Sequence, residues 1–198
     1  MIEAGRPDGT RSTPPAAVTL CAMDRTAAIA LVEQHGVVSA KVRERLVDEM
    51  GGRPLLLKAA VTQLGEDEKR GGGFPTGPVR FPPSVFDVAM GRVEDLDAVA
   101  RWALLVTATV PAGDVDLIGR VLAQDGGSVD DLADAERRHL VTVGDRVVEF
   151  DHPTVRSAVY HGAEGAHRRR AHRLVGGAMV DPAASVQHLG LGVAGPDA

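Results

Sequence analysis

The stretch at residues 147–160, VVEFDHPTVRSAVY, constrains the fold of this chain more than any other. Its apolar positions alternate up to Phe150 and recur at helical spacing after Pro153, so the period changes from two to 3.6 residues. Proline suits the first turn of a helix because the N–H it lacks would have no partner there. The stretch therefore predicts a strand that runs directly into a helix, with Asp151 or His152 at the helix cap.

His152 is the first candidate site residue of the chain. A side chain at a helix cap lies beside unpaired N–H groups and the positive end of the helix dipole, where it can meet an anion. The alternative is a capping or solvated histidine that meets no ligand. Within the same predicted helix, we expect Arg156 and Ser157 to point away from the apolar face.

Composition narrows the class of protein. Only 3% of the 198 residues are aromatic, so leucine, valine and alanine must build the core, which favours closely packed helices. The net charge of −5 gives no overall attraction to nucleic acid or to an anionic membrane. The one cysteine, Cys21, excludes an internal disulfide, and no apolar run approaches the roughly 18 residues of a membrane span. We expect a cytoplasmic protein without contact to a membrane.

The first third of the chain reads as a tail, a strand and a group of helices. Residues 1–16 lack apolar periodicity and predict a disordered tail, and 17–23 predicts a buried strand, the last one of a sheet found elsewhere. Helices are expected at about 25–35, 40–50 and 54–64. Gly51 and Gly52 stop one of them and Pro54 starts the next, which predicts a sharp corner.

The remainder divides into a linker and two further parts. Residues 66–83 are rich in glycine and then in proline, and we interpret them as a linker between domains. Residues 84–162 predict short helices followed by a β-hairpin, which is the winged-helix order. Residues 163–198 predict two helices that start a helical repeat. The expected helices are at about 84–92, 96–109, 115–123, 128–139, 164–178 and 182–191, and the expected strands at 140–143 and 146–150.

A set of motifs, taken together, resembles a known family. The motifs are VRERL at 42–46, GGRPLLL at 51–57, ERRHLV at 136–141, FDHPTVRSAVY at 150–160, RRRAHRL at 168–174, DP at 181–182 and QHL at 187–189. Spread over residues 17–197, this set resembles the large ATP-binding transcriptional regulators of the LuxR type, which belong to the STAND class of signal-transduction ATPases.

The resemblance implies a mainly α fold: a last strand of the nucleotide-binding domain plus a helical lid at 17–65, a winged-helix domain with a short β-hairpin at 84–162, and the start of a TPR-like repeat domain at 163–198. It also implies three residues that contact nucleotide. Gly52 and Pro54 match the Gly-x-Pro motif of the lid, and His152 stands where the family has the histidine of a Met-His-Asp motif, which contacts the β-phosphate of ADP. This chain reads Asp-His-Pro at that place.

The chain lacks the GxxxxGK[ST] loop whose amides and lysine would hold a triphosphate. We therefore expect no enzyme, and no cofactor for this chain alone, with ATP or ADP bound only in a full-length context. The expected function is a non-catalytic regulatory fragment that couples nucleotide state to conformational opening. The expected partners are a P-loop domain and a helical sensor domain, with DNA reached only through a separate C-terminal domain; self-association is left open.

Two other functions follow from local patterns. A freestanding winged-helix protein would read DNA with residues 128–139, but that segment carries four acids and only two arginines. The basic run at 167–173 could make the last part a protein-interaction module that docks an acidic surface, or it could be the solvated face of an ordinary amphipathic helix. The spacing of the histidines and of the cysteine predicts neither a metal site nor a catalytic residue.

Overall fold

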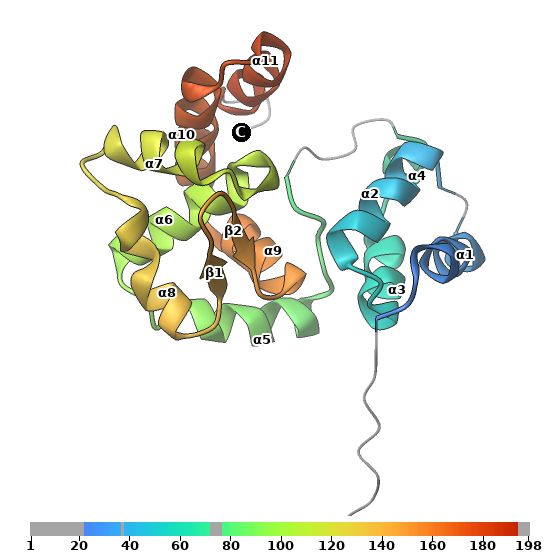
Figure 1. Cartoon of the computed structure of the whole chain (residues 1–198). Helices are drawn as coiled ribbons and strands as arrows, with labels where there is room; N and C mark the ends of the chain where they lie inside the picture. The colour runs from blue at the N-terminus through green and yellow to red at the C-terminus, as the bar shows by residue number, and fades with distance from the viewer. Residues whose placement is uncertain (1–21, 37, 72–76, 194–198) are drawn as a thin grey trace, which may run out of the picture.

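The computed structural model describes residues 22–36, 38–71 and 77–193 (Figure 1). The expected tail at 1–16, Cys21 and most of the expected strand at 17–23 lie outside the described residues. Within them the protein is mainly helical, with one small antiparallel sheet of two strands, as the sequence predicts.

The helices form two units that lie side by side in Figure 1. The first unit contains α1 (Arg25–His35), α2 (Ala40–Met50), α3 (Pro54–Gln63) and α4 (Glu66–Lys69). The second unit contains α5 (Pro83–Val93), α6 (Ala98–Thr109), α7 (Val115–Ala123), α8 (Ala133–Arg137), α9 (Pro153–Gly162), α10 (Gly165–Ala178) and α11 (Pro182–Leu191). It also holds the strands β1 (Val141–Val143) and β2 (Val148–Phe150) and the 3-10 turns η1 (Pro111–Gly113) and η2 (Val129–Leu132).

Side-chain caps and left-handed glycines set the helices of the first unit. Asp24 accepts from the Ala27 N–H at the start of α1, and Ser39 does the same for Val42 at the start of α2. Gly51 and Gly52 have φ values of 56° and 68°, which turn the chain sharply between α2 and α3. The predicted corner is therefore present. The core of the first unit is mainly aliphatic and includes Val32, Val42, Leu46, Met50, Leu57 and Val61.

The range 66–83, interpreted as a linker, has more structure than a linker requires. It begins with the short helix α4, which is capped by the Glu68 carboxylate through the Gly65 N–H at 2.8 Å. Further on, Val79 and Phe81 are buried in the core of the first unit. We refer to residues 77–81 as the connecting segment, because they lie between the two units.

The second unit is built around α6, whose residues from Ala103 to Thr109 are all buried. Asp97 and Asp114 cap α6 and α7 with side-chain oxygens. The two strands pair with Val141 opposite Phe150 and Val143 opposite Val148, and a separate β-bridge joins Asp114 to Val147. From α6 onward the order is thus α6, the extended bridge at Asp114, α7, η2 with α8, and the hairpin of β1 and β2.

The structure differs from the sequence prediction in three places. The helix expected at 128–139 is divided into η2 and the five-residue α8, since a capping box between Ser128 and Asp131 closes a first turn and His139 adopts a left-handed φ of 54°. α5 begins at Pro83 with Pro82 at its cap. Ser157, expected to point away from the apolar face, is only 1% exposed because α9 is covered on several sides.

None of the helices in the described part of the chain is both long and apolar enough to cross a membrane.

Candidate functional site at the junction of the two units

Gly52 and Pro54 lie at the corner between α2 and α3. The Gly52 carbonyl accepts a hydrogen bond from the Met23 N–H at 2.8 Å, and a Cβ on Gly52 would come within 2.2 Å of the Met23 carbonyl oxygen. Pro54 occupies the first turn of α3 and is exposed, as is Leu55 beside it. The corner thus fixes the backbone through Gly52 and leaves the ring of Pro54 open to solvent.

His152 is the cap of α9. Its Nδ1 lies 2.6 Å from the Thr154 hydroxyl and 3.4 Å from the Thr154 backbone nitrogen, which donates to it. Burial lowers the pKa of His152, and the positive charges of Arg53 and Arg92 lower it further. The imidazole is therefore neutral near pH 7 and lies in a region of positive potential.

Arg53 links the candidate residues of the two units. It stands between Gly52 and Pro54 in the chain, and its charge acts on His152 in the other unit. Among the described residues, however, no hydrogen bond joins His152 to Gly52 or Pro54. The link between His152 and the corner is therefore the charge of Arg53, and no hydrogen bond joins the three predicted residues.

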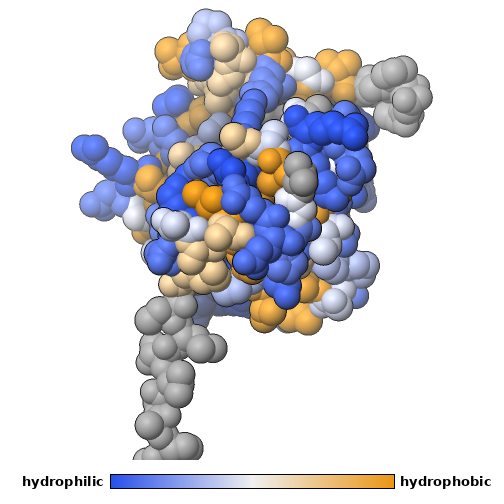
Figure 2. Space-filling model, turned by 90° about the vertical axis from the view of Figure 1, so that its right-hand side faces the viewer, coloured by the Kyte–Doolittle hydropathy of each residue, from blue (hydrophilic) through white to orange (hydrophobic). Residues whose placement is uncertain are grey.

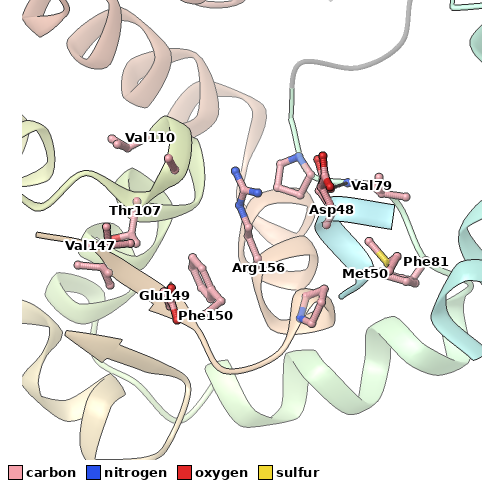
Figure 3. A pocket seen from close by; sticks show the side chains of 16 residues that line it. Asp48, Met50, Val79, Phe81, Thr107, Val110, Val147, Glu149, Phe150 and Arg156 are labelled. Carbon is pink, nitrogen blue, oxygen red and sulfur yellow. Dashed lines mark hydrogen bonds between the residues drawn. The ribbon is translucent and has the colours of Figure 1, made fainter. Parts of the chain in front are cut away.

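A cleft of about 510 Å³ lies at the junction of the units. Its walls come from the end of α2, the connecting segment, the end of α6, β2 and the start of α9 (Figure 3). The apolar lining includes Met50, Val79, Phe81, Val110, Val148 and Phe150. The charged lining consists of Asp48, Glu49, Glu149 and Arg156. A cleft of this size is within the range of small-molecule sites.

Arg156, on α9, reaches into this cleft in Figure 3. Its Nε and Nη2 donate to the carbonyl oxygen of Ala108 at 3.3 Å and 3.1 Å, near the end of α6 where carbonyl groups lack helical partners. Burial lowers the pKa of Arg156, although the Glu49 carboxylate acts in the opposite direction. The sequence predicted only that Arg156 points away from the apolar face of its helix, because nothing in the spacing of α9 indicates the unit against which the half-buried arginine packs.

The connecting segment contacts both units along the cleft. The Glu49 carboxylate accepts from the Val79 N–H at 3.3 Å, and an Arg45 nitrogen donates to the Gly77 carbonyl at 2.5 Å. From the other side, His161 Nε2 lies 2.8 Å from the Pro78 carbonyl. Backbone atoms therefore hold the two units together, in addition to side-chain packing.

A buried polar chain joins the last three helices. The Tyr160 hydroxyl lies 2.7 Å from His172 Nε2, and His172 Nδ1 lies 3.0 Å from His188 Nδ1. Burial lowers the pKa of His172 to about 4, with smaller contributions from His188 and Arg168. Both histidines are nearly inaccessible, at 2% and 4% exposure. No sequence motif indicates this chain of contacts, because its members come from three helices.

The basic run at 167–173 is largely used within the second unit. Arg168 donates to the carbonyl of Ala163, and Arg173 donates to the carbonyl of Gly192 at 2.6 Å. Arg170 pairs with Asp125 at 2.6 Å and lies over the ring of Trp102 at 5.0 Å. These contacts match an amphipathic helix whose arginines stabilise its own surroundings.

Among the described residues, no group of three or more histidine, cysteine or acidic side chains could hold a metal ion. Comparison with protein-family models, with curated proteins and with solved structures found no match to this chain.

Proposed function

We propose that this chain is the lid and winged-helix segment of a LuxR-type, ATP-dependent transcriptional regulator, and that it couples the nucleotide state of a P-loop domain to conformational opening. The segment itself is non-catalytic and acts in the cytoplasm. ATP or ADP would be held mainly by the P-loop domain, with Gly52, Pro54 and His152 completing the site. The helical repeat that starts at residue 163 would pass the change to a sensor domain.

The observation that carries this proposal is the position of His152. It caps α9 in one unit, and the charge of Arg53, from the Gly-x-Pro corner of the other unit, acts on it. A neutral imidazole that can donate a hydrogen bond, flanked by two arginines at a helix N-terminus, suits a phosphate oxygen. Because the contributing residues come from both units, a bound phosphate would favour one relative arrangement of the units over others.

The order of elements in the second unit supports the winged-helix interpretation. α6, the bridge at Asp114, α7, η2 with α8, and the hairpin of β1 and β2 follow the order of that fold. In the same interpretation α1 to α3 form the lid, and α10 with α11 form the first helical repeat.

Nuclear magnetic resonance with this chain tests the proposal. Millimolar ADP should shift the amide signals of Arg53 and Thr154 with weak affinity, and calorimetry should detect no tight binding because the P-loop is supplied elsewhere. The variant His152→Asn should abolish these shifts, while the asparagine oxygen replaces Nδ1 as the acceptor that caps α9. His35→Ala, which removes an exposed histidine of α1, is the control. Unchanged shifts in His152→Asn, or submicromolar affinity of this chain for ADP, would contradict the proposal.

A freestanding DNA-binding role has less support. The segment that would read the major groove is η2 and α8, and its arginines are engaged: Arg137 pairs with Asp134 at 2.8 Å, and Arg138 pairs with the same carboxylate at 3.1 Å. Few positive charges therefore remain to neutralise phosphates. A gel shift at nanomolar protein concentration that weakens with salt would favour this role over the regulatory one.

A further inference from the structure

The cleft at the junction of the two units is lined by one cation, Arg156, and one anion, Glu149, that form no ion pair with any residue the structure describes. Asp48 pairs with Arg25, and Glu49 pairs with Arg45 at 2.6 Å, so these two carboxylates are neutralised locally. Among the described residues, the Arg156 guanidinium donates to the Ala108 carbonyl through Nε and Nη2, and no bond from its Nη1 is found. The two lining charges that remain, on Arg156 and Glu149, are therefore of opposite sign.

Glu149 supplies the unpaired negative charge. It lies on β2 opposite Thr142 and is exposed, and its carboxylate has no hydrogen bond or ion pair within the part of the chain that the structure describes. Its neighbour Phe150 is half-buried, and Figure 3 shows the Phe150 ring between Glu149 and Arg156. Apolar surface thus separates the negative group from the positive one.

The wall that the first unit contributes carries Asp48 and Glu49 beside the apolar residues Met50, Val79 and Phe81. Met50 is 1% exposed and Val79 is 3% exposed, and both belong to the core of the first unit. The Val79 N–H is bound by Glu49, which fixes this wall against α2. The far end includes Ala112, which adopts a left-handed φ of 53°, a conformation that costs free energy for a residue with a Cβ.

We propose that this cleft binds a small zwitterion with an apolar body, of the class of apolar amino acids and their short peptides. The carboxylate of the ligand would lie against Arg156, the ammonium group against Glu149, and the apolar body against the half-buried ring of Phe150. Since the walls come from both units, an occupied cleft would hold the units in one arrangement. This inference does not depend on nucleotide binding.

A matched set of three probes tests the charge requirement. L-phenylalanine, 3-phenylpropionate and phenethylamine share a phenyl body and carry both charges, only the carboxylate, or only the ammonium group. Amide chemical shifts of residues 48–50 and 147–150 report binding. We expect L-phenylalanine to bind about tenfold more tightly than either singly charged probe, because each charged hydrogen bond contributes about that factor.

Substitutions in the cleft assign each charge to its residue. Arg156→Gln should weaken the binding of L-phenylalanine and 3-phenylpropionate about tenfold and leave that of phenethylamine unchanged. Glu149→Gln should weaken the binding of L-phenylalanine and phenethylamine about tenfold and leave that of 3-phenylpropionate unchanged. Arg120→Gln, at an exposed arginine of α7 outside the cleft, is the control. Glu149 is exposed and makes no contact that folding requires, so its variant remains informative if Arg156→Gln destabilises the fold.

Three results would overturn the inference: no shifts at 10 mM of any probe, equal affinity for L-phenylalanine and 3-phenylpropionate, or equal losses in Arg120→Gln and Arg156→Gln. The same titrations separate this site from the nucleotide contact. His152→Asn should leave L-phenylalanine binding unchanged, and Glu149→Gln should leave the shifts caused by ADP unchanged.

Discussion

The two units of this protein use polar side chains in different ways. On the first unit, arginines pair with carboxylates at the surface: Arg25 with Glu44 and Asp48, and Arg43 with Glu33. Figure 2, which views the molecule from this side, shows many hydrophilic side chains with smaller hydrophobic patches among them. Such exposed pairs are screened by salt and contribute little stability.

The second unit also carries surface pairs, such as Arg170 with Asp125 and Arg137 with Asp134, but some of its polar side chains bond to backbone carbonyls or to each other instead. Arg156 bonds to the Ala108 carbonyl, Arg173 bonds to the Gly192 carbonyl, and His172 lies between two buried partners. The contacts of His172 are buried and therefore shielded from salt, and they require neutral imidazoles. The difference indicates that ionic strength acts on the surface pairs of both units, whereas pH acts mainly on the second.

The largest expected effect tests whether each unit has its own core. Leu104→Ala should destabilise the second unit by about 4 kcal/mol, because Leu104 is fully buried in α6 and its removal leaves a cavity. Urea unfolding followed by the fluorescence of Trp102, the one tryptophan of the chain, measures this change. Leu57→Ala is the matched change in the first unit.

Hydrogen exchange of peptides from α1 to α3 then reports the first unit. Leu57→Ala should accelerate exchange there, whereas Leu104→Ala should affect mainly peptides of α6 to α10. If either variant accelerates exchange equally in both units, the units unfold together and the comparison between them fails.

The second effect is the pH dependence of the second unit. The pKa of His172 is about 4 in the folded protein against an ordinary value of 6.5, so its contribution to stability is complete above pH 6.5. As pH falls from 6.5 towards 4, the unfolded chain takes up the proton first and the unit loses up to about 3 kcal/mol. Urea midpoints from Trp102 fluorescence at pH 7, 6 and 5 measure this loss.

His172→Gln is the control for the pH effect, since glutamine can hydrogen-bond but does not titrate in this range. It should lower stability at pH 7 and flatten the decline below pH 6.5. A decline of the same slope in this variant would assign the effect to other groups.

The third effect concerns the corner between α2 and α3. Gly52→Ala should cost about 2 kcal/mol, because alanine disfavours a φ of 68° and its Cβ would collide with the Met23 carbonyl. Gly91→Ala, within α5, is the matched control: its Cβ would meet nothing within 4 Å, and the change should stabilise by about 0.7 kcal/mol. Hydrogen exchange of α3 peptides measures the effect of Gly52→Ala, and Trp102 fluorescence during urea unfolding measures the effect of Gly91→Ala. If Gly52→Ala left the stability of the first unit unchanged, the backbone at the corner would have relaxed to accommodate the Cβ.

The smallest effect is that of a surface ion pair. Glu33→Gln removes the partner of Arg43 and should change the stability of the first unit by about 0.5 kcal/mol in dilute buffer. In 1 M NaCl the variant and the parent should become equal, because the charges are screened. Exchange rates of α1 and α2 peptides at both salt concentrations measure this. An effect that persists in high salt would mean that the surface pairs of the first unit resemble the buried contacts of the second.

Local signals in the sequence were enough to predict most helices. Asp24, Ser39 and Pro153 mark helix starts, and Gly51 marks a stop, because caps and breakers act within one turn of the chain. The divided helix around Leu132 was not predicted, since a capping box and the left-handed His139 interrupt an otherwise helical pattern.

The site could be predicted only in part. Pro153 predicts Asp151 or His152 as the cap, and the structure selects His152; the effect of the Arg53 charge on His152 requires the packing of one unit against the other. Arg156 and the partners of His172 depend on contacts between residues far apart in the sequence, which periodicity does not encode.

The connecting segment has a practical consequence for anyone who divides this protein. A cut placed before Val79 would deprive the first unit of two core side chains, Val79 and Phe81, and a cut after them would leave Tyr160 without the glycine backbone on which its ring rests. Either cut would therefore remove a packing partner from one of the units. A substitution in residues 77–81 should therefore affect the packing of both units. Expression of separate halves is best attempted with the connecting segment included in each half.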